Sequence, residues 1–235
     1  MLRSRSALLV AVLLFVTVEV TLGVLLQVTP TPVCWHFSFL AVVLACAFCL
    51  LLAARTPAYA LTQIALALTV FSDSILVYGR TGYTVLAMCA FSLVQLVYGV
   101  RILLAVGRYR GLQLAVRGGI SVIAVLAVGV VVGGAADALA YISLFYFANL
   151  LVNAVFAWTV GDRPPLLAIG LLLFVLCDIF VGFSMLSEYL PLPDTPLVAF
   201  LASPPINMAW VFYLPCQVLL SLSLLPAKWR ALGNE

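Results

Sequence analysis

Residues 172–182 read LLFVLCDIFVG, a run of large apolar side chains with one carboxylate, Asp178, near its middle. A second stretch, LTVFSDSILVYG at 68–79, has Asp73 near its centre. A charged side chain at the centre of a bilayer costs about 3 kcal/mol even on the scales that give the lowest values. Because ionisable residues inside membrane spans usually mark functional sites, we expect these two aspartates to form the centre of the site.

The composition of the whole chain is that of an integral membrane protein. Its 235 residues are 66% hydrophobic and only 8% charged, and the mean hydropathy is +1.27. A soluble domain carries about 25% charged residues, so this chain has too little polar surface to fold as a water-soluble globule. The net charge of +3 comes from arginines between apolar runs, which indicate membrane topology, and we expect no nucleic-acid partner.

Eight stretches of the chain are long and apolar enough to cross a bilayer as helices, which takes about 20 residues each. We therefore predict an all-α fold, a single domain over residues 1–235 that forms a polytopic bundle of eight transmembrane helices. The first span resembles a signal peptide, but it continues to Val28 without an Ala-x-Ala cleavage site, so we expect it to be retained. The segment 188–205 contains five prolines and is predicted to be a loop folded against the membrane surface. The eight predicted spans are about 7–28, 34–54, 58–79, 83–106, 112–133, 137–160, 165–187 and 205–225.

The positive charges predict the orientation of this bundle. With the N-terminus in the cytoplasm, ten of the eleven basic residues fall on the cytoplasmic side and only Arg80 falls outside. An even number of spans then places both termini in the cytoplasm, of either a bacterial cytoplasmic membrane or an endoplasmic-reticulum-type membrane. The ten basic residues are Arg3, Arg5, Arg55, Arg101, Arg108, Arg110, Arg117, Arg163, Lys228 and Arg230.

The two aspartates are predicted to share one level of the membrane with several uncharged polar side chains. Asp73 lies roughly 10 Å from Arg80, and Asp178 roughly 15 Å from Glu188, along a helix axis. Pairs spaced three or four residues apart share one helix face, so four helices can direct polar groups toward a common cavity that would bind substrate. These residues are Gln95 and Tyr98, Asn149 and Asn153, and Tyr213 and Gln217.

The alternative for each of these polar residues is a hydrogen bond between helices, worth about 1 kcal/mol. That role explains two carboxylates poorly, because no Lys or Arg is predicted at their depth. Glu19 is a further candidate at comparable depth, and Arg80 is a candidate for a lipid phosphate or an interface anchor. His36 is the only histidine, and Cys46 and Cys49 have no second ligand pair, so we expect no metal and no cofactor.

Four segments of the chain together resemble one known family. They are FSDSILVYG around Asp73, Phe91-x-x-x-Gln95-x-x-Tyr98, GLLLFVLCD ending at Asp178, and FYLPCQVLL at 212–220. Their order and spacing are similar to those of the YhhN-like family, the lysoplasmalogenases, whose two aspartates correspond to Asp73 and Asp178. The chain departs from the family pattern at Gln95, where the family usually has His, and at Cys177, where it usually has Ser.

The resemblance implies a hydrolase that cleaves the vinyl-ether bond of lysoplasmalogen, a lysophospholipid. The products would be a fatty aldehyde and glycerophospho-ethanolamine or glycerophosphocholine. Vinyl ethers cleave once a proton reaches the alkene carbon, which creates an oxocarbenium ion. A neutral carboxyl group can donate that proton while a carboxylate stabilises the cation and activates water, as in glycosidases.

Two other classes of protein fit the same residues. Buried carboxylates also serve as proton relays, so the alternative is a proton-coupled transporter or a lipid-binding membrane protein. A purely structural membrane subunit is the third interpretation, and it predicts that both aspartates tolerate replacement by Asn. Release of aldehyde by the purified protein distinguishes the enzyme from both.

Overall fold

A computed structural model describes residues 5–30, 33–52, 56–79, 81–161 and 165–225 of the chain. These residues form α-helices joined by short turns, four of which are single turns of 3-10 helix. The α-helices are α1 (Arg5–Val28), α2 (Val33–Leu51), α3 (Pro57–Tyr78), α4 (Thr84–Val106), α5 (Arg110–Val131), α6 (Ala138–Ala157), α7 (Leu166–Leu186), α8 (Pro196–Ala202) and α9 (Met208–Leu222).

Seven of these helices, α1 to α7, are long and apolar enough to cross a membrane. The seven spans agree with the first seven predicted from sequence, and the chain is an all-helical, multi-pass membrane protein. The eighth predicted span corresponds to α9, which is apolar but only 15 residues long. A count of eight spans is therefore not confirmed by helix length.

The loop predicted at 188–205 contains a helix, which corrects that prediction. Helix α8 begins where the Thr195 side chain accepts a hydrogen bond from the Val198 N–H, and Pro196 occupies its first turn, where a missing N–H costs nothing. The ring of Phe200 in α8 packs edge-on against Phe180 in α7, with the centroids 5.8 Å apart. The prolines therefore start a helix here rather than exclude one.

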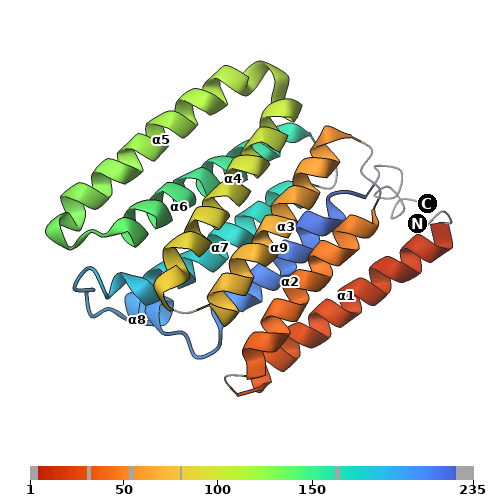
Figure 1. The fold of residues 1–235 in the computed structure, drawn as a ribbon, viewed down its shortest axis with the longest axis horizontal. Helices are drawn as coiled ribbons and strands as arrows, with labels where there is room; N and C mark the ends of the chain where they lie inside the picture. Colours follow the sequence, from red (N-terminus) through yellow and green to blue (C-terminus); the bar gives the residue numbers. More distant parts are fainter. Residues whose placement is uncertain (1–4, 31–32, 53–55, 80, 162–164, 226–235) are drawn as a thin grey trace.

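The helices form two layers, which Figure 1 shows from the side of the first. Helices α1, α2, α3 and α4 follow one another in the nearer layer, and α6, α7 and α9 lie behind them. Contacts between α4 and α6 and between α2 and α9 join the layers, while α5 lies at one edge against α6. Helices far apart in the sequence, such as α3 and α9, thus come into contact.

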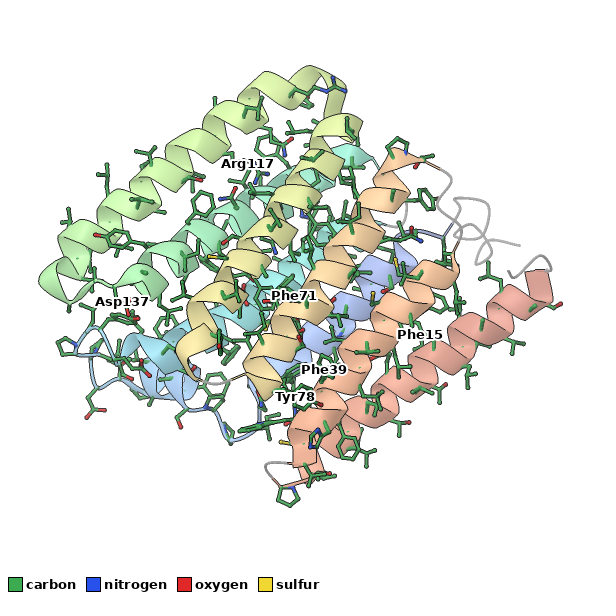
Figure 2. The ribbon with its side chains drawn as sticks, viewed as in Figure 1. Phe15, Phe39, Phe71, Tyr78, Arg117 and Asp137 are labelled. Carbon is green, nitrogen blue, oxygen red and sulfur yellow. The ribbon has the colours of Figure 1, made fainter. Side chains whose placement is uncertain are left out.

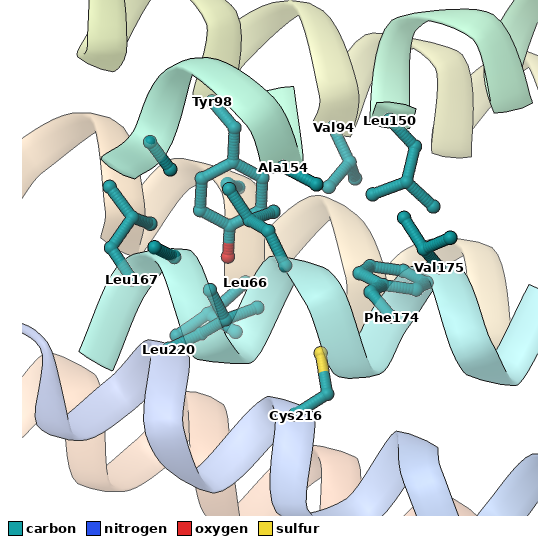
Figure 3. Close-up of a cluster of buried hydrophobic side chains, with 14 of the residues drawn as sticks. Leu66, Val94, Tyr98, Leu150, Ala154, Leu167, Phe174, Val175, Cys216 and Leu220 are labelled. Atoms are coloured by element: carbon teal, nitrogen blue, oxygen red, sulfur yellow. The ribbon is translucent and has the colours of Figure 1, made fainter. Parts of the chain in front are cut away.

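The space between the layers is filled mostly by apolar side chains. In Figure 3 the cluster includes Leu66, Val94, Leu150 and Leu220, all fully buried, and Tyr98 extends into it from α4. Many large apolar residues on the outer surface are instead exposed, as in Val130 at 83%. Exposed apolar side chains of this kind are expected on helices whose outer faces contact lipid.

Outside the spans, Asp137 fixes the start of α6. Its Oδ1 accepts hydrogen bonds from the Ala140 N–H at 2.9 Å and from the Tyr189 hydroxyl at 3.0 Å, the arrangement of a helix N-cap. The Ala140 bond is the largest of the causes that lower the pKa of the Asp137 carboxyl. Burial first, and then the bond to Asp137, raises the pKa of Tyr189 to about 12. The contact joins the beginning of α6 to the segment after α7.

The described residues include five of the eleven basic residues. Arg3, Arg55, Arg80, Arg163, Lys228 and Arg230 lie outside them. The cytoplasmic orientation of the termini therefore stays a prediction.

Candidate functional site

Asp73 in α3 is held by a tyrosine from the other end of the chain. The hydroxyl of Tyr213 in α9 donates a hydrogen bond of 2.7 Å to Asp73 Oδ2. The neighbouring Ser72 hydroxyl donates to the Ala87 carbonyl oxygen of α4 at 2.6 Å, which fixes α3 against α4. Asp73 is only 5% exposed, so its carboxyl group lies in the interior of the bundle.

Asp178 in α7 has a matching partner. The hydroxyl of Tyr146 in α6 donates a hydrogen bond of 2.5 Å to Asp178 Oδ2. Tyr146 is buried, whereas Asp178 is half-buried and keeps part of its surface accessible. The two carboxyl groups therefore have the same kind of partner and different degrees of exposure.

The two carboxyl groups are connected through their tyrosine partners. Phe174, which is fully buried, lies between their tyrosine partners. Its ring centroid is 5.3 Å from that of Tyr213 and 6.4 Å from that of Tyr146. Asp73 and Asp178 belong to different layers of the fold, so the site spans the boundary between the layers.

Asn149 and Asn153 have a different partner, the guanidinium group of Arg117. Arg117 Nη1 donates to Asn149 Oδ1 and Nη2 donates to Asn153 Oδ1, each at 2.6 Å. The Asn153 amide in turn donates to the backbone oxygen of Gln95 at 2.7 Å and to its side-chain Oε1 at 3.0 Å. Asn149 and Asn153, the predicted same-face pair, thus connect α6 to α5 and α4. We call Arg117, Asn149, Asn153 and Gln95 the Arg117 cluster.

Gly99 in α4 provides the space for this guanidinium group. A Cβ atom built at Gly99 would lie 2.6 Å from Arg117 Nη2 and 2.9 Å from Arg117 Cζ. Figure 2 shows Arg117 in the space between α5 and α4. A side chain at position 99 would therefore displace the guanidinium.

Three further residues predicted for the site, Tyr98, Gln217 and Glu19, are buried, and in the described part of the chain none is hydrogen-bonded to the aspartates. The Tyr98 hydroxyl, both amide atoms of Gln217 and both carboxyl oxygens of Glu19 have no hydrogen-bond partner among the residues that the structure describes. Glu19 is 2% exposed and lies on α1, outside the hydrogen bonds of the aspartate pair. Arg80 lies outside the described residues.

The structure thus brings Tyr213 to Asp73 and gathers Gln95, Asn149 and Asn153 around Arg117. That all six polar residues line one cavity with the aspartates stays a prediction.

Sequence reasoning missed Tyr146 and the role of Arg117. Tyr146 lies three residues before Asn149, so the spacing used for the other pairs would have placed it on the same face of α6. Arg117 lies only seven residues from the first residue of α5, and it was counted as a marker of the membrane surface. Its long side chain reaches instead to the amides of α6.

The described fold is therefore that of a polytopic helical membrane protein with two tyrosine-bonded aspartates inside its bundle. The chain belongs to the YhhN family, whose model matches residues 33–224. That match includes both aspartates, both of their tyrosine partners and the Arg117 cluster. No curated protein and no solved structure matches the chain significantly.

Proposed function

We propose that this protein is a membrane-embedded hydrolase that cleaves the vinyl-ether bond of lysoplasmalogen, a lysophospholipid. The observation that carries the proposal is the pair of aspartates inside the bundle, each hydrogen-bonded by a tyrosine that packs against Phe174. Membership of the YhhN family supports the same reaction.

The proposed reaction adds one water molecule across the vinyl ether. A neutral carboxyl group donates its proton to the alkene carbon that is not bonded to oxygen, which leaves an oxocarbenium ion at the other carbon. The second carboxyl group, ionised, stabilises that cation and takes a proton from the attacking water. In the resulting hemiacetal the bond between the former alkene carbon and the glycerol oxygen breaks. The first carboxyl group takes back a proton from the hemiacetal hydroxyl, and the second donates the proton that it took from water to the leaving glycerol oxygen. The products are a fatty aldehyde and a glycerol hydroxyl, and both carboxyl groups return to their starting states.

The different surroundings of the two aspartates suit a division between acid and base. Asp73 is buried beneath Tyr213, whereas Asp178 keeps accessible surface. We assign the more accessible Asp178 as the base that activates water, and Asp73 as the acid. Two carboxyl groups in unequal environments divide the same tasks in glycosidases.

Purified protein in detergent tests this proposal directly. Incubation with 1-alkenyl lysophosphocholine should release a fatty aldehyde and glycerophosphocholine in equal amounts. The matched 1-alkyl lysophospholipid, which has no double bond to protonate, should give no product. Absence of aldehyde from the alkenyl substrate would contradict the proposal.

One observation favours a second candidate function, a proton-coupled transporter. Glu19 is buried in α1 with neither carboxyl oxygen hydrogen-bonded in the part of the chain that is described. A buried carboxyl group of this kind suits a proton relay. Proton uptake that depends on Glu19, without aldehyde release, would favour this candidate over the hydrolase.

For the membrane arrangement we propose eight spans, with α9 as the eighth. Fifteen helical residues extend roughly 22 Å, and the chain on either side of α9 can cover the remaining thickness. Six residues of α9 are buried against its neighbours, and Figure 1 places it beside α2 and α3 within the bundle. With this helix the proposed topology has both termini in the cytoplasm.

A further inference from the structure

Arg117 is a cation inside a membrane span, and its hydrogen-bond partners among the described residues are neutral. It belongs to the span Arg110–Val131, and its two hydrogen bonds go to amide oxygens of Asn149 and Asn153. Within the described ranges no carboxylate forms an ion pair with it. Charged residues inside spans almost always pair with an opposite charge or face a water-filled space, so this guanidinium is suited to bind an anion.

The Arg117 cluster holds hydrogen-bond donors that no described residue uses. A guanidinium group has five N–H donors, and the two bonds to Asn149 and Asn153 occupy two of them. The side-chain Nε2 of Gln95 is fully buried and has no acceptor among the described residues, while its Oε1 is fixed by Asn153. Arg117 is only half-buried, which leaves it open to a ligand that brings oxygen acceptors.

The position of the cluster along α6 sets its distance from the carboxyl groups. Tyr146, which binds Asp178, lies three residues before Asn149 and seven before Asn153, or roughly 4 and 10 Å along the helix axis. In a glycerophospholipid, five single bonds of about 1.5 Å separate the ether oxygen at the first carbon from the phosphorus, an extended span of roughly 6 Å. Along the axis of α6, the spacing between the two sets of contacts is thus comparable with the spacing between the phosphate and the ether oxygen of such a lipid.

We propose that Arg117, with the side-chain N–H groups of Gln95, binds the phosphate group of a lysophospholipid whose ether bond lies at Asp73 and Asp178. The guanidinium fork matches two phosphate oxygens, and Asn149 and Asn153 hold it in position. The inference rests on the proposed function for the ether half of the substrate. Binding of the phosphate group rests only on the contacts of the Arg117 cluster and does not require hydrolysis.

A binding measurement tests the phosphate site without hydrolysis. Full-length protein in a non-ionic detergent is titrated with 1-alkyl lysophosphocholine, with 1-alkylglycerol, which lacks the phosphate, and with inorganic phosphate. We expect the phosphorylated lipid to bind at least roughly tenfold more tightly than the alkylglycerol, the size of one charge-assisted hydrogen bond. Arg117→Gln should remove this difference, and Arg117→Lys should keep only part of it because the fork is lost.

Two binding outcomes would overturn the inference. One is a preference for the phosphorylated lipid that Arg117→Gln leaves unchanged. The other is inorganic phosphate binding that requires Arg117 and does not compete with the lipid, which would make this a site for a free anion.

Glycine variants give a second measurement that leaves Arg117 itself in place. Gly99→Ala introduces a Cβ atom where the guanidinium now lies, so it should weaken binding of the phosphorylated lipid and raise KM for the alkenyl lysophospholipid severalfold. It should leave KM for 1-alkenylglycerol unchanged. Gly118→Ala is the matched control, because a Cβ atom there meets nothing within 4 Å, and it should change neither value. An equal rise in KM for the alkenyl lysophospholipid and for 1-alkenylglycerol in Gly99→Ala would contradict the phosphate site and leave Arg117 with a structural role only.

The two proposals can fail separately. Arg117-dependent binding of the phosphorylated lipid without any aldehyde release would refute the hydrolase and keep the phosphate site. The opposite result is aldehyde release in which KM is the same for phosphorylated and phosphate-free substrates, both in wild type and in Arg117→Gln. That result would refute the phosphate site and keep the hydrolase.

Discussion

The hydroxyl of Tyr213 donates a hydrogen bond to the carboxylate of Asp73 at 2.7 Å, across 140 positions of sequence. Tyr146 makes the equivalent bond to Asp178 across 32 positions. Tyr213 comes from the layer opposite to that of Asp73, whereas Tyr146 and Asp178 belong to the same layer. Both tyrosines pack against Phe174. The aspartates are thus fixed in position before any substrate enters.

Replacement of either aspartate by asparagine should abolish most of the proposed activity. Asn has nearly the same shape and can neither give nor take a proton in this role. We expect Asp73→Asn and Asp178→Asn each to lower the rate of aldehyde release at least about a hundredfold, and the double variant to be hardly worse, because groups that act as a unit are not additive. A well-folded Asn variant with near-full activity would rule out the carboxyl pair.

The tyrosines should matter less than the carboxyl groups that they hold. Tyr213→Phe and Tyr146→Phe each remove one hydrogen bond to an acidic group and preserve the aromatic packing on Phe174. A hydrogen bond to a charged group such as ionised Asp178 contributes about 1.5–3 kcal/mol, and one to a neutral group such as protonated Asp73 about 0.5–1.5 kcal/mol. Tyr146→Phe should therefore lower kcat roughly tenfold or more and Tyr213→Phe less, with little change in KM. Tyr141→Phe in α6 serves as the control, because no hydrogen bond joins Tyr141 to either aspartate among the described residues. An equal fall in kcat for Tyr141→Phe would point to a general effect of the substitution.

Close packing of α7 on α9 depends on Gly170. A Cβ atom at this position would lie 3.1 Å from Leu220 and 3.4 Å from the Cys216 carbonyl oxygen. Gly170→Val should therefore force the helices apart and destabilise the protein by about 1–3 kcal/mol, measured as a lower unfolding temperature in detergent. Gly182→Ala on the same helix, where a Cβ atom meets nothing within 4 Å, should not lower it.

The cap of α6 should make stability depend on pH at the acidic end. The pKa of Asp137 is lower in the folded protein than in the unfolded chain, first because of the Ala140 N–H. The ionised group therefore stabilises the fold above its unfolded pKa, and this contribution is lost as the pH falls through the folded pKa. Asp137→Ala should lower the unfolding temperature at neutral pH. In acid, the unfolding temperatures of the variant and of wild type should become equal. A difference between the two proteins that stays constant down to acid pH would show that the charge is not involved.

Reporters at the two ends of the chain test the proposed topology. Fusions or labelled cysteines at Ser4 and Asn234 should both report the cytoplasmic side. Reporters on opposite sides of the membrane would leave an odd number of spans and exclude α9 as the eighth.

The sequence predicted the helices better than the contacts between them. Apolar runs of about 20 residues follow from bilayer thickness alone, so seven spans could be placed to within a few residues. Asp73 and Asp178 could be singled out because a charge is costly in hydrocarbon. Their partners depend on which helices pack together, and neither hydropathy nor spacing says that α9 returns to α3.

Arg117 shows why a charge near a helix end is difficult to interpret from sequence. Its backbone lies close to the start of α5, where an arginine normally extends to the membrane surface. The absence of a side chain at Gly99 and the two amides of α6 together allow the guanidinium to lie inward. Both of those features belong to other helices, so the α5 segment alone could not reveal them.

Because Asp73 and Asp178 belong to different layers, the pair exists only while the layers are in register. A detergent that lets the layers slide would separate the carboxyl groups and leave every helix intact. Far-ultraviolet circular dichroism would record an unchanged spectrum for such a preparation, although the site had been lost. Distance measurements between spin labels on α3 and α7 would detect the change, and they are the appropriate quality control for any inactive sample.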